Sequence, residues 1–163
     1  MVGCRIHFDE LTSDPEVDAA PATVDAASVT CPPTYTVAAT GCYRWSTPAV
    51  STNPAAAASA CAADGQGAHL AVISSVEENQ VLTALQGATT SWIGLAKPSD
   101  VFVWVTGEMP VFSRWAPGDP NGEGNCARLL QTVGDWDDDP CTKNQAYLCE
   151  IDGLSATVVP PAA

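Results

Sequence analysis

Cysteine content constrains the fold of this chain more than any other feature of its sequence. Seven cysteines are many for a reducing compartment, and no two have the Cys-x-x-Cys spacing of a zinc site or a thioredoxin-like dithiol. We therefore predict that six of them form three disulfides in a secreted or cell-surface protein and that one is left over. Sequence alone leaves the pairing open. The cysteines are Cys4, Cys31, Cys42, Cys61, Cys126, Cys141 and Cys149.

Charge and length exclude several classes of partner. Six basic against nineteen acidic residues give the chain a net charge of −13, which would repel nucleic acid and anionic lipid head groups. No apolar run approaches the roughly 18–20 residues that a transmembrane helix needs. The 163 residues suffice for one ordinary domain with a flanking segment. We expect no nucleic-acid partner and no transmembrane segment.

The two ends of the chain differ in composition from its middle. Residues 1–30 are a predicted tether, because residues 9–30 mix acids with Ala, Pro, Thr and Ser and contain no aromatic side chain. Residues 153–163 are small, apolar and proline-rich, which predicts a disordered tail. One folded domain is therefore expected over residues 31–152.

Cys4 has two interpretations, and both remain open. The run Met1-Val2-Gly3-Cys4 is similar to the end of a bacterial lipobox, in which the cysteine carries a lipid anchor and a flexible tether follows. The lack of Asn-x-Ser/Thr acceptors and the alanine-rich, lysine-poor composition also favour a bacterial source. In the alternative, Cys4 is an unpaired or intermolecularly paired thiol.

The order of secondary structure predicts an α+β fold. Residues 53–65 carry an N-cap asparagine, a proline at the first helical position and a terminating glycine, and residues 75–87 begin with a capping box and also end on glycine. Short β-rich runs follow, which predicts two helices packed on antiparallel sheets with a long irregular loop over about residues 106–125. The predicted strands are Ser91–Leu95, Phe102–Val105, Cys126–Leu130 and Gln145–Ile151.

Acidic and amide side chains cluster in that loop and again one strand later. The runs are Asp119-Pro120-Asn121-Gly122-Glu123 and Trp136-Asp137-Asp138-Asp139. Hard oxygen ligands in this number suit calcium better than a transition metal. An EF-hand is excluded because Leu130 stands where its bidentate glutamate would be. For an isolated cluster of this kind, solvated turn residues would be the default interpretation.

Several ordered motifs resemble the C-type lectin-like domain family in its long form. The resemblance covers residues 31–152, and in that family the loop binds calcium together with a carbohydrate. The residues that carry it are Gly67–Ile73, Trp92–Leu95, Phe102–Gly107, Ser113–Gly118, and Trp136–Asp138 followed by Cys141.

This resemblance implies a disulfide pattern and a set of site residues. The pairs would be Cys31–Cys42, Cys61–Cys149 and Cys126–Cys141. Asp119 and Asn121 take the positions of the family's Glu-Pro-Asn motif, with Pro120 expected in the cis form. Asp137 and Asp138 take those of its Trp-Asn-Asp motif. Glu123 lies three residues before Cys126, where the family has its acidic ligand two residues before. The implied calcium ligands are Asp119, Asn121, Glu123, Asp137 and Asp138, and the implied sugar-binding residues are Asp119, Asn121, Glu123 and Asp137.

The acid-first, amide-third order around Pro120 resembles members that bind mannose, N-acetylglucosamine or fucose-type diols. Because Asp119 is one carbon shorter than the usual glutamate, we expect low affinity per site, so that tight binding needs several copies in a homo-oligomer or on a surface tether. The alternative is a C-type-lectin-like module that binds protein or itself without sugar. Neither His7 nor His69 lies in a catalytic motif, so we expect a binding protein and no enzyme, with His69 a packing residue.

Overall fold

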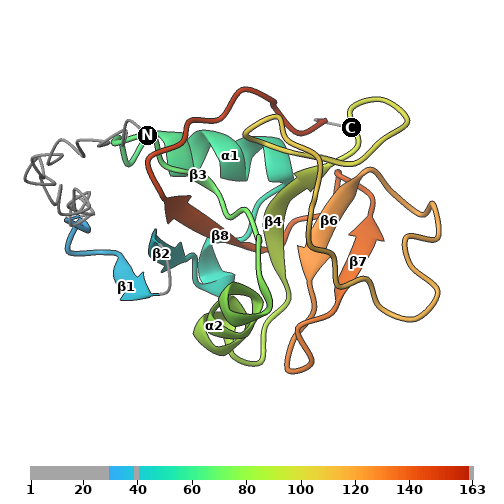
Figure 1. Ribbon diagram of the computed structural model, residues 1–163, viewed down its shortest axis with the longest axis horizontal. Helices are drawn as coiled ribbons and strands as arrows, with labels where there is room; N and C mark the ends of the chain where they lie inside the picture. Colours follow the sequence, from blue (N-terminus) through green and yellow to red (C-terminus); the bar gives the residue numbers. More distant parts are fainter. Residues whose placement is uncertain (1–29, 39–40, 162–163) are drawn as a thin grey trace, which may run out of the picture.

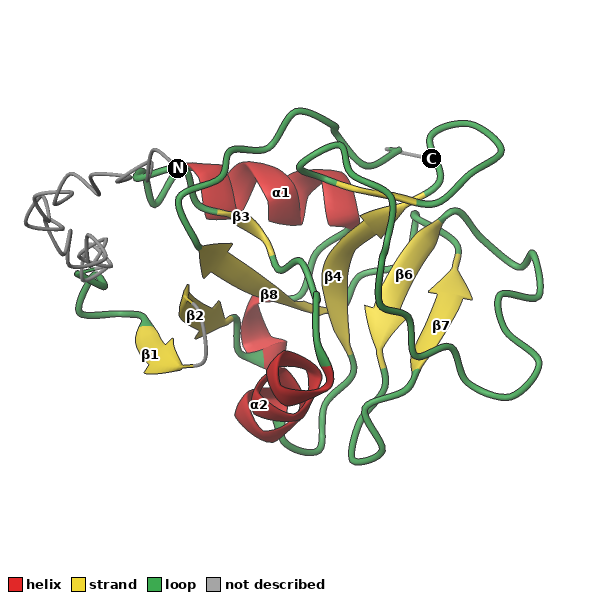
Figure 2. Cartoon of the chain, viewed as in Figure 1, coloured by secondary structure: helices red, strands yellow, loops and turns green. Residues whose placement is uncertain are grey.

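The computed structural model describes residues 30–38 and 41–161, so Cys4 and the predicted tether up to residue 29 lie outside the described residues. Two α-helices, a 3-10 helix and eight strands build the domain (Figures 1 and 2). In chain order they are β1 (Thr36–Ala38), β2 (Gly41–Trp45), η1 (Pro48–Val50), α1 (Pro54–Ala62), β3 (His69–Leu70), α2 (Val76–Gln86), β4 (Ser91–Ala96), β5 (Val103–Trp104), β6 (Cys126–Leu129), β7 (Trp136–Asp139) and β8 (Ala146–Ile151).

Both helices begin as the sequence predicts and α2 also ends as predicted, whereas α1 ends at Ala62, before the predicted terminating glycine. The Asn53 side chain accepts a hydrogen bond from the Ala56 amide at 2.9 Å and caps α1. The Ser75 hydroxyl accepts one from the Glu78 amide at 3.1 Å and caps α2, which ends at Gly87 with a φ of 62°. Glu78 does not return the bond of a capping box, because its buried carboxylate accepts from the Ser74 amide instead.

The sheet has the order β1-β2-β8-β4-β6-β7, with β3 paired to β8 and β5 paired to β4. The α+β class is confirmed, and one strand pair differs from the antiparallel expectation. Strands β4 and β8 run parallel, with Ser91 opposite Ala146 and Trp92 opposite Tyr147. A parallel pair needs a long crossover, and here the loop together with β6 and β7 provides it. The sheet is therefore mixed.

The long loop is anchored by aromatic packing around one tryptophan. The fully buried Trp136 ring lies 5.6 Å from Phe112 and 5.9 Å from Trp115 of the loop, both edge to face, and 5.6 Å from Trp104. Its indole N–H donates to the Asn79 side chain at 2.7 Å, which links this cluster to α2. Such pairs add to the stabilisation from burial, so the loop is held although it has little regular structure.

Three disulfides close the domain: Cys31–Cys42, Cys61–Cys149 and Cys126–Cys141. This is the pattern that the family resemblance implied. The second disulfide joins α1 to β8, with a sequence separation of 88 residues. The third joins the first residue of β6 to Cys141, which follows the end of β7. The site loop is thereby fixed at its exit.

The chain after β8 differs from the disordered tail expected from its composition. The amides of Thr157 and Val158 both donate to the Val105 carbonyl, at 2.7 and 2.8 Å, and Pro160 is buried. An extended segment of this kind forms its backbone hydrogen bonds with another part of the chain. Its order is therefore not visible as a periodic hydrophobic pattern in its own sequence. The helices of the described residues are all too short to span a bilayer.

Candidate calcium site in the long loop

Three carboxylates from two segments come together at the tip of the loop. Asp119, Asp137 and Asp138 each offer an oxygen within 4.8 Å of the others. The peptide bond between Asp119 and Pro120 is cis, as expected. Asp119 comes from the loop, and the two other aspartates come from β7, so the Trp136 cluster that holds the loop against β7 also assembles this group.

The side chain of Asp138 holds the loop through hydrogen bonds to its backbone. Its side chain is fully buried, and its two oxygens accept hydrogen bonds from the amides of Asn121, Gly122 and Gly124 at 2.7, 3.0 and 3.2 Å. Three backbone donors on one carboxylate fix the course of the loop before any ion binds. Asp138 is therefore a structural residue as well as a candidate ligand.

Asp137 has a cationic partner within the sheet. Arg128 lies opposite Asp137 in the β6–β7 register, and its Nε and Nη2 both donate to Asp137 Oδ2, at 2.9 and 2.6 Å. The same guanidinium reaches Asp139 at 2.6 Å, and Asp139 also binds Lys143. Alternate strand residues face one side of a sheet, which explains why Arg128 contacts both aspartates. Asp139 is neutralised and is no part of the candidate site.

Asn121 and Glu123 lie at the exposed tip of the loop. The Asn121 side-chain oxygen accepts from the Glu123 amide at 2.9 Å, which forms a local turn. Glu123 lies outside the group of three aspartates. Of the five implied ligands, the structure thus brings the carboxylates of Asp119, Asp137 and Asp138 together, while Asn121 and Glu123 are exposed beside them.

A glycine occupies the position two residues before Cys126, where the family has its acidic ligand. A Cβ atom on Gly124 would lie 1.9 Å from the Asp139 carbonyl carbon, so this position has no room for any side chain. The loop therefore packs its backbone directly onto the end of β7. This close approach accounts for the acid standing one residue earlier, at Glu123.

The carboxylates repel one another in the absence of a cation. The pKa of Asp119 is raised above its usual value by partial burial and by the negative charges of Asp137, Asp138 and Glu123, while Arg128 opposes the shift. An all-oxygen donor set with excess negative charge fits calcium, which takes 6–8 oxygen ligands, with water or sugar hydroxyls completing the shell. The residues present therefore fit a calcium ion held mainly by aspartates.

Arg128 is the residue near this site that sequence analysis missed. Nothing in the run Cys126–Leu129 marks an arginine as a partner of Asp137, because the contact depends on the register between β6 and β7. The strand β7 itself was not predicted, since three consecutive aspartates are rare in strands.

Comparison with known proteins places the chain in a family. Residues 50–151 match the family described as lectin C-type domain. The chain belongs to the C-type lectin domain family, whose members are binding proteins and not enzymes.

Among relatives, lectin BRA-3 of Megabalanus rosa is 37% identical over 119 residues, which cover 68% of this chain and 70% of that protein. Human C-type lectin domain family 4 member G is 33% identical, and the match covers 74% of this chain but only 42% of that protein.

Two solved structures show how widely the fold is used. The C-type carbohydrate-recognition domain of cow CD23, determined in the presence of a GlcNAc2Man3 oligosaccharide, has a TM-score of 0.66 and 29% identity, covering 74% of this chain and 95% of that one. A calcium-independent type II antifreeze protein has a TM-score of 0.65 and 28% identity, covering 74% of this chain and 93% of that one. Membership of the family therefore leaves the ligand to be argued from the site.

Proposed function

We propose that this domain binds carbohydrate through a calcium ion held in the long loop. The observation that carries this proposal is the convergence of Asp119, Asp137 and Asp138 within 4.8 Å. Calcium binds through carboxylate oxygens, and its remaining coordination positions are available to two adjacent hydroxyls of a sugar ring. The neighbourhood of this cluster is exposed at Asn121 and Glu123, so a sugar can approach it.

Each residue has a defined role in this scheme. Asp138 and Asp119 hold the ion, and Asp137 adds its Oδ1, because Oδ2 is engaged by Arg128. Asn121 donates from its amide to one sugar hydroxyl, and Glu123 or Asp119 accepts from the other. The acid-first order around Pro120 supports equatorial diols of the mannose, N-acetylglucosamine or fucose type. Affinity per site would be low, near the millimolar range that corresponds to about −4 kcal/mol.

The setting is outside the cytosol. Three disulfides in a domain of this size persist only in an oxidising environment. The relative lectin BRA-3 carries the lectin name, which agrees with a protein that meets glycans at a surface or in extracellular fluid. We therefore propose a secreted or cell-surface location.

A second candidate function is calcium-independent binding of another protein, and one observation favours it. Arg128 already neutralises Asp137, and backbone amides already satisfy Asp138, so the loop is held without an ion. The structural similarity to a calcium-independent antifreeze protein indicates that the fold tolerates this state.

A glycan array separates these two functions. The full chain would be applied with millimolar calcium and again with chelator, beside Asp119→Asn, which removes a ligand charge while leaving the buried hydrogen bonds intact. Glu77→Gln, an exposed acid on α2, is the matched control for loss of charge. Calcium-dependent retention on mannose-type glycans, lost in Asp119→Asn and kept in Glu77→Gln, is the expected result. Preference for galactose would contradict the sugar class, and absence of any calcium-dependent retention would contradict the proposed function.

A further inference from the structure

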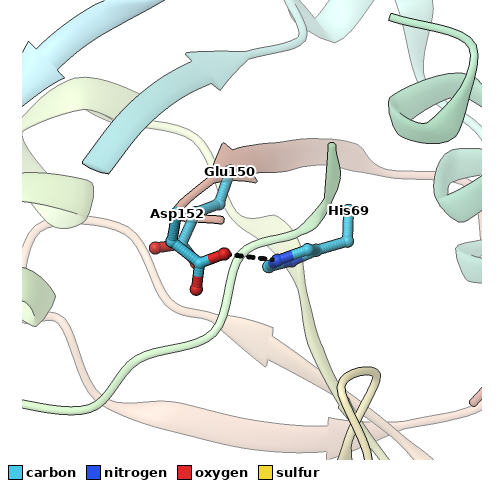
Figure 3. Close-up of side chains that lie close together, drawn as sticks. All are labelled: His69, Glu150 and Asp152. Carbon is cyan, nitrogen blue, oxygen red and sulfur yellow. Dashed lines mark hydrogen bonds and ion pairs between the residues drawn. The ribbon is translucent and has the colours of Figure 1, made fainter. Parts of the chain in front are cut away.

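A second cluster of metal-binding side chains lies on another part of the sheet, at β3 and the end of β8. His69 of β3 stands opposite Glu150 of β8 in the antiparallel register, and Asp152 follows two residues later. One ligand atom of each lies within 4.8 Å of the others. Figure 3 shows the His69 ring directed at the Asp152 carboxylate, with Glu150 beside it. His69 is 1% exposed and Glu150 is 2% exposed.

Backbone groups fix the orientation of all three side chains. The Nδ1 of His69 lies 2.9 Å from the Leu70 carbonyl, which only accepts, so Nδ1 carries a proton. Nε2 faces Asp152 Oδ1 at 3.1 Å and donates to it when the ring is charged, so a metal ion bound to Nε2 would take the place of that second proton. The Val72 amide donates to Glu150 Oε2, and the Leu154 amide donates to Asp152 Oδ1, each at 2.8 Å. Metal-binding histidines usually donate their second nitrogen to a carbonyl or carboxylate in this way, which orients the ligand.

We propose that His69 Nε2, Glu150 and Asp152 bind a divalent transition metal ion, with zinc as the best fit. One imidazole and two carboxylates make a zinc donor set, whereas calcium prefers oxygen alone. Zinc bonds of about 2.0–2.2 Å place ligand atoms roughly 3.3 Å apart. The separation of 3.1 Å between His69 Nε2 and Asp152 Oδ1 is close to this value, and an oxygen of Glu150 lies within 4.8 Å of both. This site is independent of the calcium loop.

A cavity lies beside the two carboxylates of this cluster. It measures about 310 Å³ and is lined by Glu150 and Asp152 together with the acids Glu78 and Glu108. No lysine or arginine lines it among the residues that the structure describes. A cation is therefore attracted to the cavity, and a bound ion keeps one position open to water or to an anionic group of a ligand.

Metal binding here would connect β3 to the segment that follows β8. Asp152 begins the extended stretch that returns to Val105, so an ion shared with His69 would hold the start of that stretch in place. Binding to the folded state alone stabilises it according to the ratio of free metal to the dissociation constant. Zinc should therefore raise the melting temperature even when calcium already saturates the loop.

Isothermal titration of zinc in millimolar calcium tests this site. The full chain with its three disulfides intact would carry Cys4→Ser and His7→Gln, which remove other zinc-binding side chains. One equivalent of zinc is expected, and Co²⁺ should give the visible absorption band of a four-coordinate site. Asp152→Asn, which still accepts from the Leu154 amide, and His69→Gln should each weaken zinc binding at least tenfold. Glu108→Gln removes one charge from the same cavity without removing a ligand, and should change the affinity less than twofold.

Three results would overturn the proposal. They are the absence of zinc binding, zinc binding unchanged in Asp152→Asn, and equal weakening by Glu108→Gln and Asp152→Asn. Because His69 is buried, the zinc affinity of His69→Gln is used only if this variant unfolds cooperatively, which shows that it is folded. If it does not, the zinc affinity of Asp152→Asn alone tests the proposal. The melting shift with calcium should be the same in Asp152→Asn as in the parent chain, which separates this site from the loop.

Discussion

Arg128 and Asp137 face each other across β6 and β7, and two guanidinium nitrogens donate to the same carboxylate oxygen, Asp137 Oδ2, at 2.9 and 2.6 Å. Arg128 thus occupies the Oδ2 atom of Asp137, and neither of these two hydrogen bonds involves Oδ1. A fixed positive charge beside a candidate calcium site both stabilises the empty site and opposes the ion. We therefore expect this pair to influence how strongly calcium stabilises the fold.

Removing this charge should increase the dependence on calcium. We expect Arg128→Gln to destabilise the metal-free protein by roughly 3 kcal/mol, because Asp137 loses its cationic partner and the buried Asp139 keeps only Lys143 as one. Its melting temperature should then rise more with calcium than that of the parent chain. Arg128→Lys keeps the positive charge but loses the forked geometry of the guanidinium. Its stability and its calcium response should lie between those of the parent chain and Arg128→Gln. An identical calcium response in all three proteins would show that Arg128 has no influence on the loop.

Calcium itself should stabilise the fold. At a hundredfold excess over the dissociation constant, an ion that binds only the folded state adds about 2.7 kcal/mol. Thermal unfolding would be followed by circular dichroism in calcium and in chelator. Asp119→Asn should shrink the rise in melting temperature, and Glu77→Gln should leave it intact. A melting temperature that is the same in calcium and chelator would favour calcium-independent protein binding.

Gly124 should resist conversion to the residue that the family carries there. Gly124→Glu places a carboxylate two residues before Cys126, but its Cβ would meet the Asp139 backbone at 1.9 Å. We expect this variant to melt lower and to bind calcium more weakly than the parent chain, and Gly124→Ala to show the same loss of stability. Asn125→Glu, an exposed acid one residue later, is the control and should be nearly neutral. Tighter calcium binding by Gly124→Glu, measured by titration, would disprove this packing argument.

The acids near β8 should make the metal-free protein less stable as pH rises. Burial and the charge of Glu78 raise the pKa of Glu150 to about 8. The folded state therefore holds a proton that the unfolded state releases near pH 4.5, so this stabilisation is complete below pH 4.5 and is lost as pH rises toward 8. His69 acts in the same direction: burial lowers its pKa, but the hydrogen bonds to Asp152 and the Leu70 carbonyl and the charges of Asp152 and Glu150 together outweigh burial and raise the pKa.

Denaturant unfolding in chelator should measure this effect. At about 1.4 kcal/mol per pKa unit, stability should fall by several kcal/mol between pH 5 and pH 9. Glu150→Gln should flatten most of this slope, and Glu77→Gln should not. A slope that persists unchanged in Glu150→Gln would assign the pH dependence to other groups.

Sequence patterns predicted the parts of this molecule that depend on local chemistry. Caps at Asn53 and Ser75 bounded both helices, and the family motifs gave the three disulfides and the cis peptide at Pro120. Contacts set by strand register were not predictable. His69 was expected to be a packing residue because its neighbours in sequence are apolar, yet its ring nitrogen meets Asp152, 83 residues away. The same limit applies to Glu78, which was assigned to the helix cap: its buried carboxylate accepts from the hydroxyl of Tyr43 in β2, 35 residues earlier in the chain.

The segment after β8 also bears on where this domain ends as an autonomous folding unit. The family match ends at residue 151, whereas the carbonyl oxygen of the buried Val105 accepts from the amides of Thr157 and Val158. A chain cut at residue 151 would lose both of these donors and the buried Pro160. We therefore expect a fragment that ends with the family match to be less stable than the chain that keeps the segment after β8.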